Sequence, residues 1–440
     1  MNIPKQSQKA TIEQLESPGV QRSDVTLYFL ILSHFRSLNR GTFKLLNCRF
    51  LRLFGYGSFF FCLIACVGFA GEPAKRSICL NMIVKDEAPV ILRCLKSVKS
   101  LIDYWVIVDT GSTDGTQKVI KEFMSDLPGE LHERPWVNFG HNRNEALRLA
   151  RGKGDYLLFI DADEELEGSF DKRLLQSSVY FASFRISQSP LVSYPRAFLI
   201  DNRIDSNWVG VIHESLTWTQ GHSSELLQNV AVSSETKDGH RSQDPQKFLK
   251  DAQTLERALI DEPDNAEYVF YLGQSYYNAG KYSLALEQYK KRAEMPGWDQ
   301  TAFWAKYFSG CLQETLKMDP KIFIKSYSDA FHFRPTRAEP LFRMANHYYT
   351  EGNYILAYAL TKTGLEIPVP DDAVYVEDWI YAHGMLGVFA NSAKALGKTE
   401  EAIASYEKLS KISGISEFMQ TQAISTKEFL EEQRTGTLNK

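Results

Sequence analysis

The chain has 440 residues, of which 44% are hydrophobic and 24% charged, and its formal net charge is -4. This length exceeds one ordinary domain and predicts two or three. The composition is that of a globular protein, and the slightly acidic balance offers no basic surface for DNA or RNA, so no nucleic-acid partner is expected. The six cysteines include no CxxC pair. They therefore predict neither a disulfide framework nor a structural zinc site, and they suit a reducing compartment.

The N-terminal extension, residues 1–75, differs from the rest of the chain. No charged residue occurs from Leu53 to Gly71, and several Lys and Arg residues precede this stretch. A signal peptide has this pattern, and so does a short membrane anchor that keeps the N-terminus inside. A third interpretation is a start assigned too far upstream. Membrane association through residues 53–71 is thus one expectation, and a cytoplasmic, membrane-associated or secreted location stays open.

Strand and helix signals alternate in the next part of the chain, residues 76–240. Apolar runs of strand type are separated by segments with helical spacing of apolar residues. The predicted strands are 77–84, 104–110 and 156–160, and the predicted helices are 87–99, 117–127 and 142–151. This alternation predicts an α/β domain with a parallel sheet and helices on both faces.

Carboxylates follow two of the predicted strands. Asp109 ends one strand, and Asp161 and Asp163 follow another. Ligands of such sheets bind at the carboxyl ends of the strands. An adjacent pair of carboxylates suits a hard divalent cation, Mn²⁺ or Mg²⁺, that also holds diphosphate oxygens. The alternative is that Asp161 and Asp163 only cap a following helix.

Three stretches resemble the catalytic core of family 2 glycosyltransferases. They are SICLNMIVKDEAPVILRCLKSV (77–98), VIVDTGSTDGT (106–116) and HNRNEALRLARGKGDYLLFIDADEEL (141–166). The resemblance implies a GT-A, Rossmann-like fold. It also implies inverting transfer of a sugar from a nucleoside-diphosphate sugar, UDP-linked, to a hydroxyl of a protein, glycan or lipid acceptor.

The same resemblance assigns roles to individual residues. Asp109 matches an acid that contacts uracil and ribose, and Asp161 and Asp163 match the D-x-D that binds the metal and diphosphate. The remaining matches line the nucleoside site or lie near the base and phosphates. They are Ile83, Lys85, Glu87 and Arg143. Lys85-Asp86-Glu87 stands where relatives often have Lys-Asn-Glu, which argues against a role for Asp86. The alternative for Asp109 and residues 112–116 is turn and helix-cap chemistry, and both roles can hold at once.

A later segment, Ser193 to Leu216, resembles the R-x-F…W-x-G-x-[IV]-H-E stretch of a subgroup of these enzymes. His213 is the predicted third metal ligand, and Glu214 is the predicted general base for the acceptor hydroxyl. A structural role for His213 remains the alternative. Asp201 and Asp205 are rival bases.

Beyond the polar boundary at 233–245 the pattern is helical only. Residues 266–289 have the spacing of a tetratricopeptide unit, and 341–360, 394–409 and a degenerate 304–335 repeat it. The period is roughly 34 residues. We therefore predict a helical-repeat domain over 245–430. Such repeats stack because one helical hairpin cannot bury its own apolar face. The array either binds a protein partner or acceptor, or only supports the preceding domain.

Two other functions compete with glycosyl transfer. A sugar-nucleotide pyrophosphorylase should have a Gly-rich, Arg-containing loop after the first strand, and Val84 to Pro89 has none. A non-catalytic scaffold with a degenerate front domain would have no reason to keep Asp109, Arg143, Asp161 and Asp163.

Overall fold

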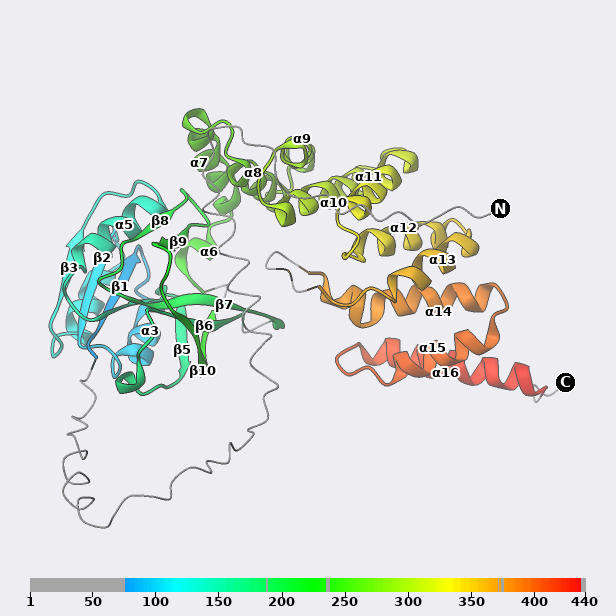
Figure 1. Cartoon of the computed structure of the whole chain (residues 1–440), viewed down its shortest axis with the longest axis horizontal. Coiled ribbons are helices and arrows are strands. Elements are labelled where there is room, and N and C mark those ends of the chain that lie inside the picture. The colour runs from blue at the N-terminus through cyan, green and yellow to red at the C-terminus, as the bar shows by residue number, and fades with distance from the viewer. Residues whose placement is uncertain (1–75, 187–188, 235–237, 371, 373–375, 437–440) are drawn as a thin grey trace, which may run out of the picture. The chain divides into compact units, whose positions relative to one another are not determined.

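The computed structural model describes residues 76–186, 189–234, 238–370, 372 and 376–436 (Figure 1). The extension 1–75, with its apolar segment 53–71, lies outside the described residues. Within the ranges described, no helix is both long and apolar enough to cross a membrane. Both strands and helices occur up to Ser234. In the described residues from His240 onward, all the elements are helices.

A mixed sheet of eight strands forms the first part. Its order is β3-β2-β1-β4-β7-β6-β10-β5. Strands β1 to β4 run parallel to one another, whereas β7 is antiparallel to both β4 and β6, and β5 is antiparallel to β10. The strands are β1 Ile78–Val84, β2 Tyr104–Asp109, β3 Gly129–Glu133, β4 Tyr156–Phe159, β5 Glu164–Gly168, β6 Val179–Ile186, β7 Ser189–Asp201 and β10 Ser224–Ser234. A separate hairpin pairs β8 Ser206–Val209 with β9 Ser215–Trp218.

The three predicted strands are present, and they form the parallel part of the sheet. The second half of the sheet, for which no strands were predicted, is mixed, with β7 antiparallel to its neighbours and β10 parallel to β6. The alternative in which Asp161 and Asp163 cap a following helix is wrong, because the chain continues as strand β5. This strand pairs with β10, in register from Glu164 opposite Ser234. Because the partner strand lies far along the chain, the local sequence of β5 gives little indication that it forms a strand.

Helices cover both faces of the parallel half, as predicted. They are α3 Ile91–Val98, α4 Thr116–Phe123 and α5 Phe139–Leu149. Helices α3 and α4 pack in the cluster that holds Ile78, Leu80 and Met82, and α5 packs with Cys79 on the opposite face. This split follows from the alternation of side chains along β1, all of which are buried except the half-buried Ile83.

The observed helices begin and end within a few residues of the predicted ones. Helix α3 begins at Ile91 instead of Glu87, because Pro89 disfavours helical geometry at the residue before it. Helix α5 begins earlier than predicted, since the side chain of Asn138 accepts a hydrogen bond from the His141 backbone N–H and caps the helix.

The remainder of the chain is a series of helical hairpins (Figure 1). The helices are α6 His240–Gln243, α7 Lys247–Asp261, α8 Ala266–Asn278, α9 Tyr282–Glu294, α10 Asp299–Thr315, α11 Pro320–Phe333, α12 Glu339–Thr350, α13 Tyr354–Gly364, α14 Met385–Ala395, α15 Thr399–Ser410 and α16 Glu417–Thr435. The predicted repeats fall on these hairpins. Small residues sit where the helices approach: a Cβ on Gly273 would lie 2.9 Å from the Tyr289 ring, and Ala285 and Ala357 are fully buried.

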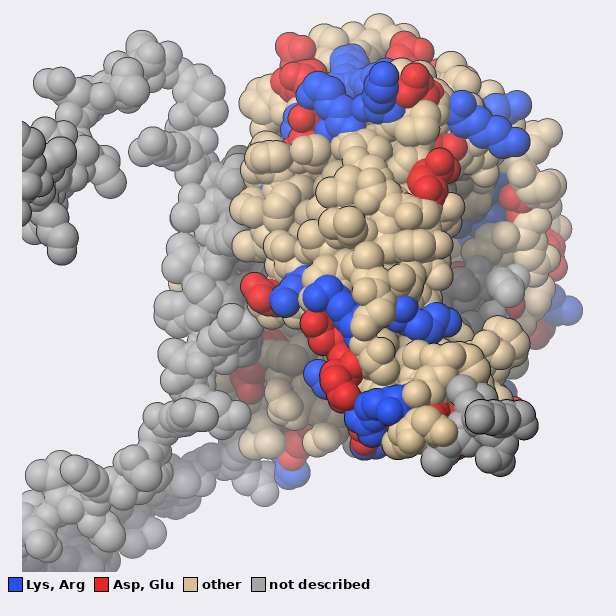
Figure 2. All heavy atoms as spheres, turned by 90° about the vertical axis from the view of Figure 1, so that its right-hand side faces the viewer, with Lys and Arg blue, Asp and Glu red and all other residues tan. Residues whose placement is uncertain are grey.

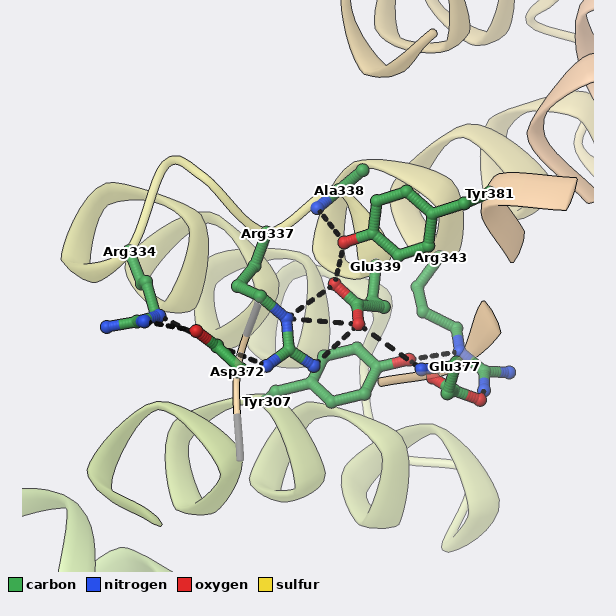
Figure 3. Close-up of polar contacts among 9 residues, drawn as sticks. All are labelled: Tyr307, Arg334, Arg337, Ala338, Glu339, Arg343, Asp372, Glu377 and Tyr381. Carbon is green, nitrogen blue, oxygen red and sulfur yellow. Dashed lines mark hydrogen bonds and ion pairs between the residues drawn. The ribbon is translucent and has the colours of Figure 1, made fainter. Parts of the chain in front are cut away.

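A buried polar network links three segments of this array (Figure 3). The guanidinium of Arg337 binds the Glu339 carboxylate at 2.6 Å, and both side chains are 0% exposed. Arg337 also binds Asp372 at 2.8 Å, and the Tyr381 hydroxyl donates to Glu339. The network therefore fastens the segment after α13 to the start of α12.

Charged side chains of both signs are mixed on the face shown in Figure 2, where an area without Lys, Arg, Asp or Glu lies between them. Ion pairs on the outside of the array include Arg434 with Glu400, whose side chains are 45% and 74% exposed. Such pairs are screened by water and contribute little. The buried Arg337 network is the energetically sensitive one.

Replacing Glu339 by Ala should destabilise the array by about 3–5 kcal/mol, because the guanidinium of Arg337 would stay buried without its main partner. Thermal and urea unfolding followed by circular dichroism measure this loss. Glu400→Ala, which breaks an exposed pair, is the matched control and should cost less than about 1 kcal/mol. Equal losses in the two variants would contradict the assignment.

Candidate active site

The carboxyl ends of three parallel strands meet at one edge of the sheet. Val84 is opposite Asp109, and Asn81 is opposite Phe159, so Asp161 and Asp163 follow at the same edge. The other predicted nucleoside residues of β1 lie here too. They are the half-buried Ile83 and Glu87 and the exposed Lys85. The structure thus brings together the residues singled out at the ends of the predicted strands.

The loops after β1 and β2 are fastened to each other. The Asp86 backbone N–H donates to the Ser112 hydroxyl at 2.8 Å, and the Asp86 carboxylate accepts from the Thr113 N–H at 2.7 Å. The Glu87 N–H donates to the Thr116 hydroxyl at 2.8 Å. Residues 112–116 therefore take part in contacts that hold the two loops together. Asp86 has a structural role that joins the two loops.

Asp109 is completely buried beneath these loops. Its Oδ1 accepts hydrogen bonds from the backbone N–H groups of Gly111 and Ser112, both at 2.9 Å, and from the Gln117 side chain at 3.1 Å. Its Oδ2 is buried and has no hydrogen-bond partner among the described residues. A buried acceptor of this kind is costly unless a donor reaches it, so Oδ2 marks a place for a ligand N–H or O–H.

Asp161 is held as a carboxylate by arginines. Burial favours the neutral acid, but Arg143, 2.7 Å away, and Arg196 outweigh it and lower the pKa of Asp161 below its usual value. The Asp161 backbone N–H also donates to Glu164 at 2.9 Å. Glu164 is in turn bound by both terminal nitrogens of Arg196. Asp161 is therefore negatively charged at neutral pH.

Asp163 and Glu87 lie in the negative field of their neighbours. Burial raises the pKa of Asp163 to about 6, and the charges of Asp161 and Glu164 add to the shift. Burial raises the pKa of Glu87 to about 7, with further contributions from Asp163, Asp114 and Asp161. Carboxylates that raise one another's pKa favour the arrival of a cation.

The D-x-D pair fits the chemistry of a hard divalent cation. Mg²⁺ is commonly held by one or two carboxylates, with water and substrate phosphates completing the shell. Asp161 and Asp163 supply two carboxylates, and the described residues contain no group of three or more His, Cys, Asp or Glu side chains arranged for a metal. A cation held by Asp161 and Asp163 would need water or substrate oxygens to complete its shell.

His213 lies at the tip of the β8–β9 hairpin and packs against the helical array. Its ring stacks on Tyr271 of α8, with centroids 4.4 Å apart. Burial lowers the pKa of His213 to about 4, and the positive charges of Lys247 and Arg241 lower it further. The ring is therefore neutral at neutral pH. Its role as a metal ligand stays a prediction, whereas its packing contact is observed.

Glu214 follows His213 and turns toward α5. Its Oε1 accepts from Arg143 Nε at 2.5 Å, and its side chain is only 9% exposed. The same arginine binds Asp161, so Arg143 connects the predicted base with the D-x-D. Of the rival bases, Asp201 is opposite Tyr156 at the beginning of β4, the wrong end of the strand for this site. Asp205 precedes the hairpin whose tip carries Glu214.

Helix α5 is fixed against the β8 strand by its own sequence. Asn144 exchanges two hydrogen bonds with the backbone of Trp208, both at 2.8 Å, and the Trp208 ring lies under the Arg143 guanidinium at 5.0 Å. A Cβ on Gly140 would lie 2.3 Å from the Gly210 carbonyl oxygen, so only glycine permits this approach. These contacts set the position of Arg143.

Residues 238–240 also belong to the site, although the sequence did not predict this. Asp238 binds Arg93 at 2.7 Å, and the His240 backbone N–H donates to Glu87 at 3.3 Å. A Cβ on Gly239 would lie 2.6 Å from the nearer oxygen of Asp163. This stretch looked like a polar boundary between domains, and neither periodicity nor a motif marks it. It lies over the carboxylates only because the fold returns it there.

Residues 79–178 match the model described as Glycosyl transferase family 2. This segment of the front part is thus similar to family 2 glycosyltransferases. The match includes every strand-end residue of the site. Arg143 lies within the matched segment, whereas Glu214 and His213 lie beyond it.

Three curated proteins match segments of the chain. A TPR repeat-containing protein of Synechococcus elongatus is 42% identical over 93 residues, 21% of this chain and 22% of its own length. The SPbeta prophage-derived glycosyltransferase SunS of Bacillus subtilis is 25% identical over 49% of this chain and 53% of its own. A glycosyltransferase of Rickettsia felis is 31% identical over 28% and 40%. The chain thus spans at most about half the length of these curated relatives.

Solved structures resemble the two parts at low identity. The S. aureus TarS 1-349 structure in complex with UDP-GlcNAc has a TM-score of 0.33 and 12% identity, covering 54% of this chain and 86% of that one. MamA has a TM-score of 0.31 and 17% identity, covering 44% of this chain and 98% of that one.

The raised pKa of Glu87 in the family 2 domain predicts a pH dependence of stability. Its pKa moves from 4.5 to about 7 on folding, so the folded protein binds more protons than the unfolded chain between these values. The free energy of unfolding therefore falls as pH rises through that window. Without metal, melting temperature should fall less between pH 5 and pH 8 in Glu87→Gln than in the wild type.

Glu122→Gln on α4 is the matched control for this experiment, because the Glu122 side chain is 68% exposed. It should keep the wild-type change between the two pH values. A Glu87→Gln variant with the wild-type change would show that Glu87 does not titrate in this window.

Proposed function

We propose that the chain transfers a sugar from a UDP-sugar to an acceptor hydroxyl with inversion, using a divalent cation. The observation that carries the proposal is the buried, unpartnered Oδ2 of Asp109 at the strand edge that also bears Asp161 and Asp163. The nucleobase N–H would then bind at Asp109, and the diphosphate with its metal ion would bind beside it at Asp161 and Asp163. A nucleotide sugar needs both sites.

The nucleoside half of this site discriminates by hydrogen bonding. Oδ1 of Asp109 already accepts three hydrogen bonds, and Oδ2 is the carboxylate oxygen that remains as an acceptor. Uracil offers an imide N–H to such an acceptor, whereas N3 of neutral cytosine is itself an acceptor and would leave Oδ2 unpaired. Ile83, Lys85 and Glu87 surround the same edge and would line the base and ribose.

The diphosphate half depends on Asp161 and Asp163. Mn²⁺ or Mg²⁺ bound there would neutralise the charge that develops on the departing nucleoside diphosphate. Asp161 is kept ionised by Arg143, and Asp163 can lose its proton near neutral pH. Both carboxylates are therefore available to hold the cation and orient the diphosphate.

Glu214 is the proposed base on the acceptor side. Arg143 holds Oε1, and in the part of the chain that the structure describes no hydrogen bond to Oε2 is found. Oε2 would take the proton of the acceptor hydroxyl as that oxygen bonds to the anomeric carbon and the bond to the diphosphate breaks. A single displacement of this kind inverts the anomeric centre, and most of the acceleration would come from positioning and fixed charges.

The helical array is the proposed site for a protein acceptor or protein partner. Stacked hairpins of this class present extended surfaces to other molecules. A protein, glycan or lipid hydroxyl each fits the chemistry of Glu214, so the acceptor class is to be found by screening.

Asp109→Asn should weaken UDP binding about 10- to 100-fold, because the amide would place a donor where the nucleobase N–H needs an acceptor. Isothermal titration of UDP in the presence of Mn²⁺ measures the change. Asp126→Asn is the control, since the Asp126 side chain is 70% exposed on the same domain. Unchanged UDP affinity in Asp109→Asn would refute the nucleoside assignment.

Asp163→Ala should abolish Mn²⁺-dependent release of UDP from a nucleotide sugar. The donor is first identified by thermal shift with a panel of nucleotide sugars plus Mn²⁺, and release of the nucleoside diphosphate is then followed by a coupled assay. Asp126→Ala should keep wild-type turnover. Turnover of Asp163→Ala at the wild-type rate would remove the metal assignment.

A further inference from the structure

We infer that the first hairpin of the helical array, formed by α7 and α8, is part of the catalytic site. In this hairpin, Tyr271 of α8 is a positioning residue for Glu214 and acts through His213. This inference rests on the proposed function, since it concerns the placement of the proposed base. It assigns the array a task in the reaction in addition to partner binding.

The loop that carries Glu214 has an unfavourable backbone of its own. Gly210 has φ = +115° and His213 has φ = +53°, in the left-handed region that costs a non-glycine residue roughly 1–2 kcal/mol. Five residues, 210–214, connect β8 with β9 at the hairpin tip. A short loop in this conformation persists only when its surroundings hold it there.

Helix α8 provides much of that support. Ile212 is 5% exposed and lies in the apolar core of the array. Val211 is partly buried and packs against the same core, which includes Tyr268 of α8. Tyr271 stacks on His213 with an angle of 25° between the rings. Three consecutive residues before Glu214 therefore contact α8 or the core it forms.

The stack between Tyr271 and His213 is a direct contact between two ring faces, with centroids 4.4 Å apart. Its contribution therefore comes from ring contact area and geometry and does not need the tyrosine hydroxyl. Phenylalanine should replace Tyr271 with little loss, whereas alanine should leave the left-handed loop without its partner.

The position of Glu214 follows from this loop. The Val211 carbonyl accepts from the Phe139 N–H of α5 at 3.2 Å, and Glu214 then reaches Arg143 of the same helix. The hairpin tip is thus held between α5 on one side and α8 on the other. Movement of the tip by about 1 Å would misplace the base, and such errors cost about 100-fold in rate.

A second connection ties the array to the donor side. Arg241, next to His240, is paired with Asp251 of α7 and lies over the Phe139 ring at 4.7 Å. His240 in turn contacts Glu87 through its backbone. The first two full helices of the array therefore contact both the base-bearing loop and the segment over the carboxylates, so residues 76–240 alone lack part of the site.

The test compares Tyr271→Ala, Tyr271→Phe and Tyr277→Ala in the full chain. Tyr277 is on the same helix and packs against Tyr282 and Phe308 within the array, so it controls for loss of stability. The measurements are hydrogen exchange of residues 209–216, UDP affinity by titration, and kcat for UDP release from the donor.

For Tyr271→Ala we expect faster exchange in 209–216 and kcat reduced about 10- to 100-fold, with UDP affinity within about 2-fold of wild type. Tyr271→Phe should stay within about 3-fold of wild type in kcat, and Tyr277→Ala should lower the melting temperature without changing exchange in 209–216.

Unchanged exchange and kcat in Tyr271→Ala would overturn the inference, and so would equal effects of Tyr271→Ala and Tyr277→Ala. A wild-type protein that releases UDP from no donor would instead refute the proposed function. In that case hydrogen exchange alone decides whether Tyr271 holds the loop.

Discussion

The guanidinium of Arg143 is the interaction on which the rest of the site depends. It forms ion pairs with both Asp161, whose side chain is 36% exposed, and the largely buried Glu214. Both partners raise the pKa of Arg143, so it remains charged despite its burial. Removing Arg143 would leave the largely buried Glu214 carboxylate without its ion-pair partner. The arginine therefore contacts both the D-x-D and the residue proposed as the base.

The neighbouring carboxylates lack such a partner. Asp163 and Glu87 have raised pKa values because burial and surrounding acids disfavour their charged forms. The contrast with Asp161, whose pKa is lowered, divides the cluster into one part neutralised by the protein and another whose charge is left for a ligand to neutralise. Likewise, Oδ2 of Asp109 has no hydrogen-bond donor among the described residues, and we propose that the ligand supplies one. Arginines of the protein thus neutralise Asp161, whereas the charges of Asp163 and Glu87 and the acceptor of Asp109 are left for the proposed cation and substrate.

The helical array is held together by apolar packing and by a buried ion pair. Its core is apolar, with small residues at helix crossings, but the fully buried Arg337 and Glu339 fix the segment after α13 to α12 (Figure 3). At its other end the array takes up the hairpin tip at Ile212 and His213. A surface that could have served only binding or support thus contacts the loop that carries the proposed base.

The sequence by itself determined the parallel strands, Asp109 and the D-x-D at their ends, and the helical repeats. These features follow from local periodicity, and parallel strands bring their carboxyl ends to one edge. Only the tertiary structure decided that β5 pairs with β10, that residues 238–240 lie over Asp163, and that His213 stacks on Tyr271. Each of these contacts joins residues more than 50 positions apart, and no local pattern records the partner.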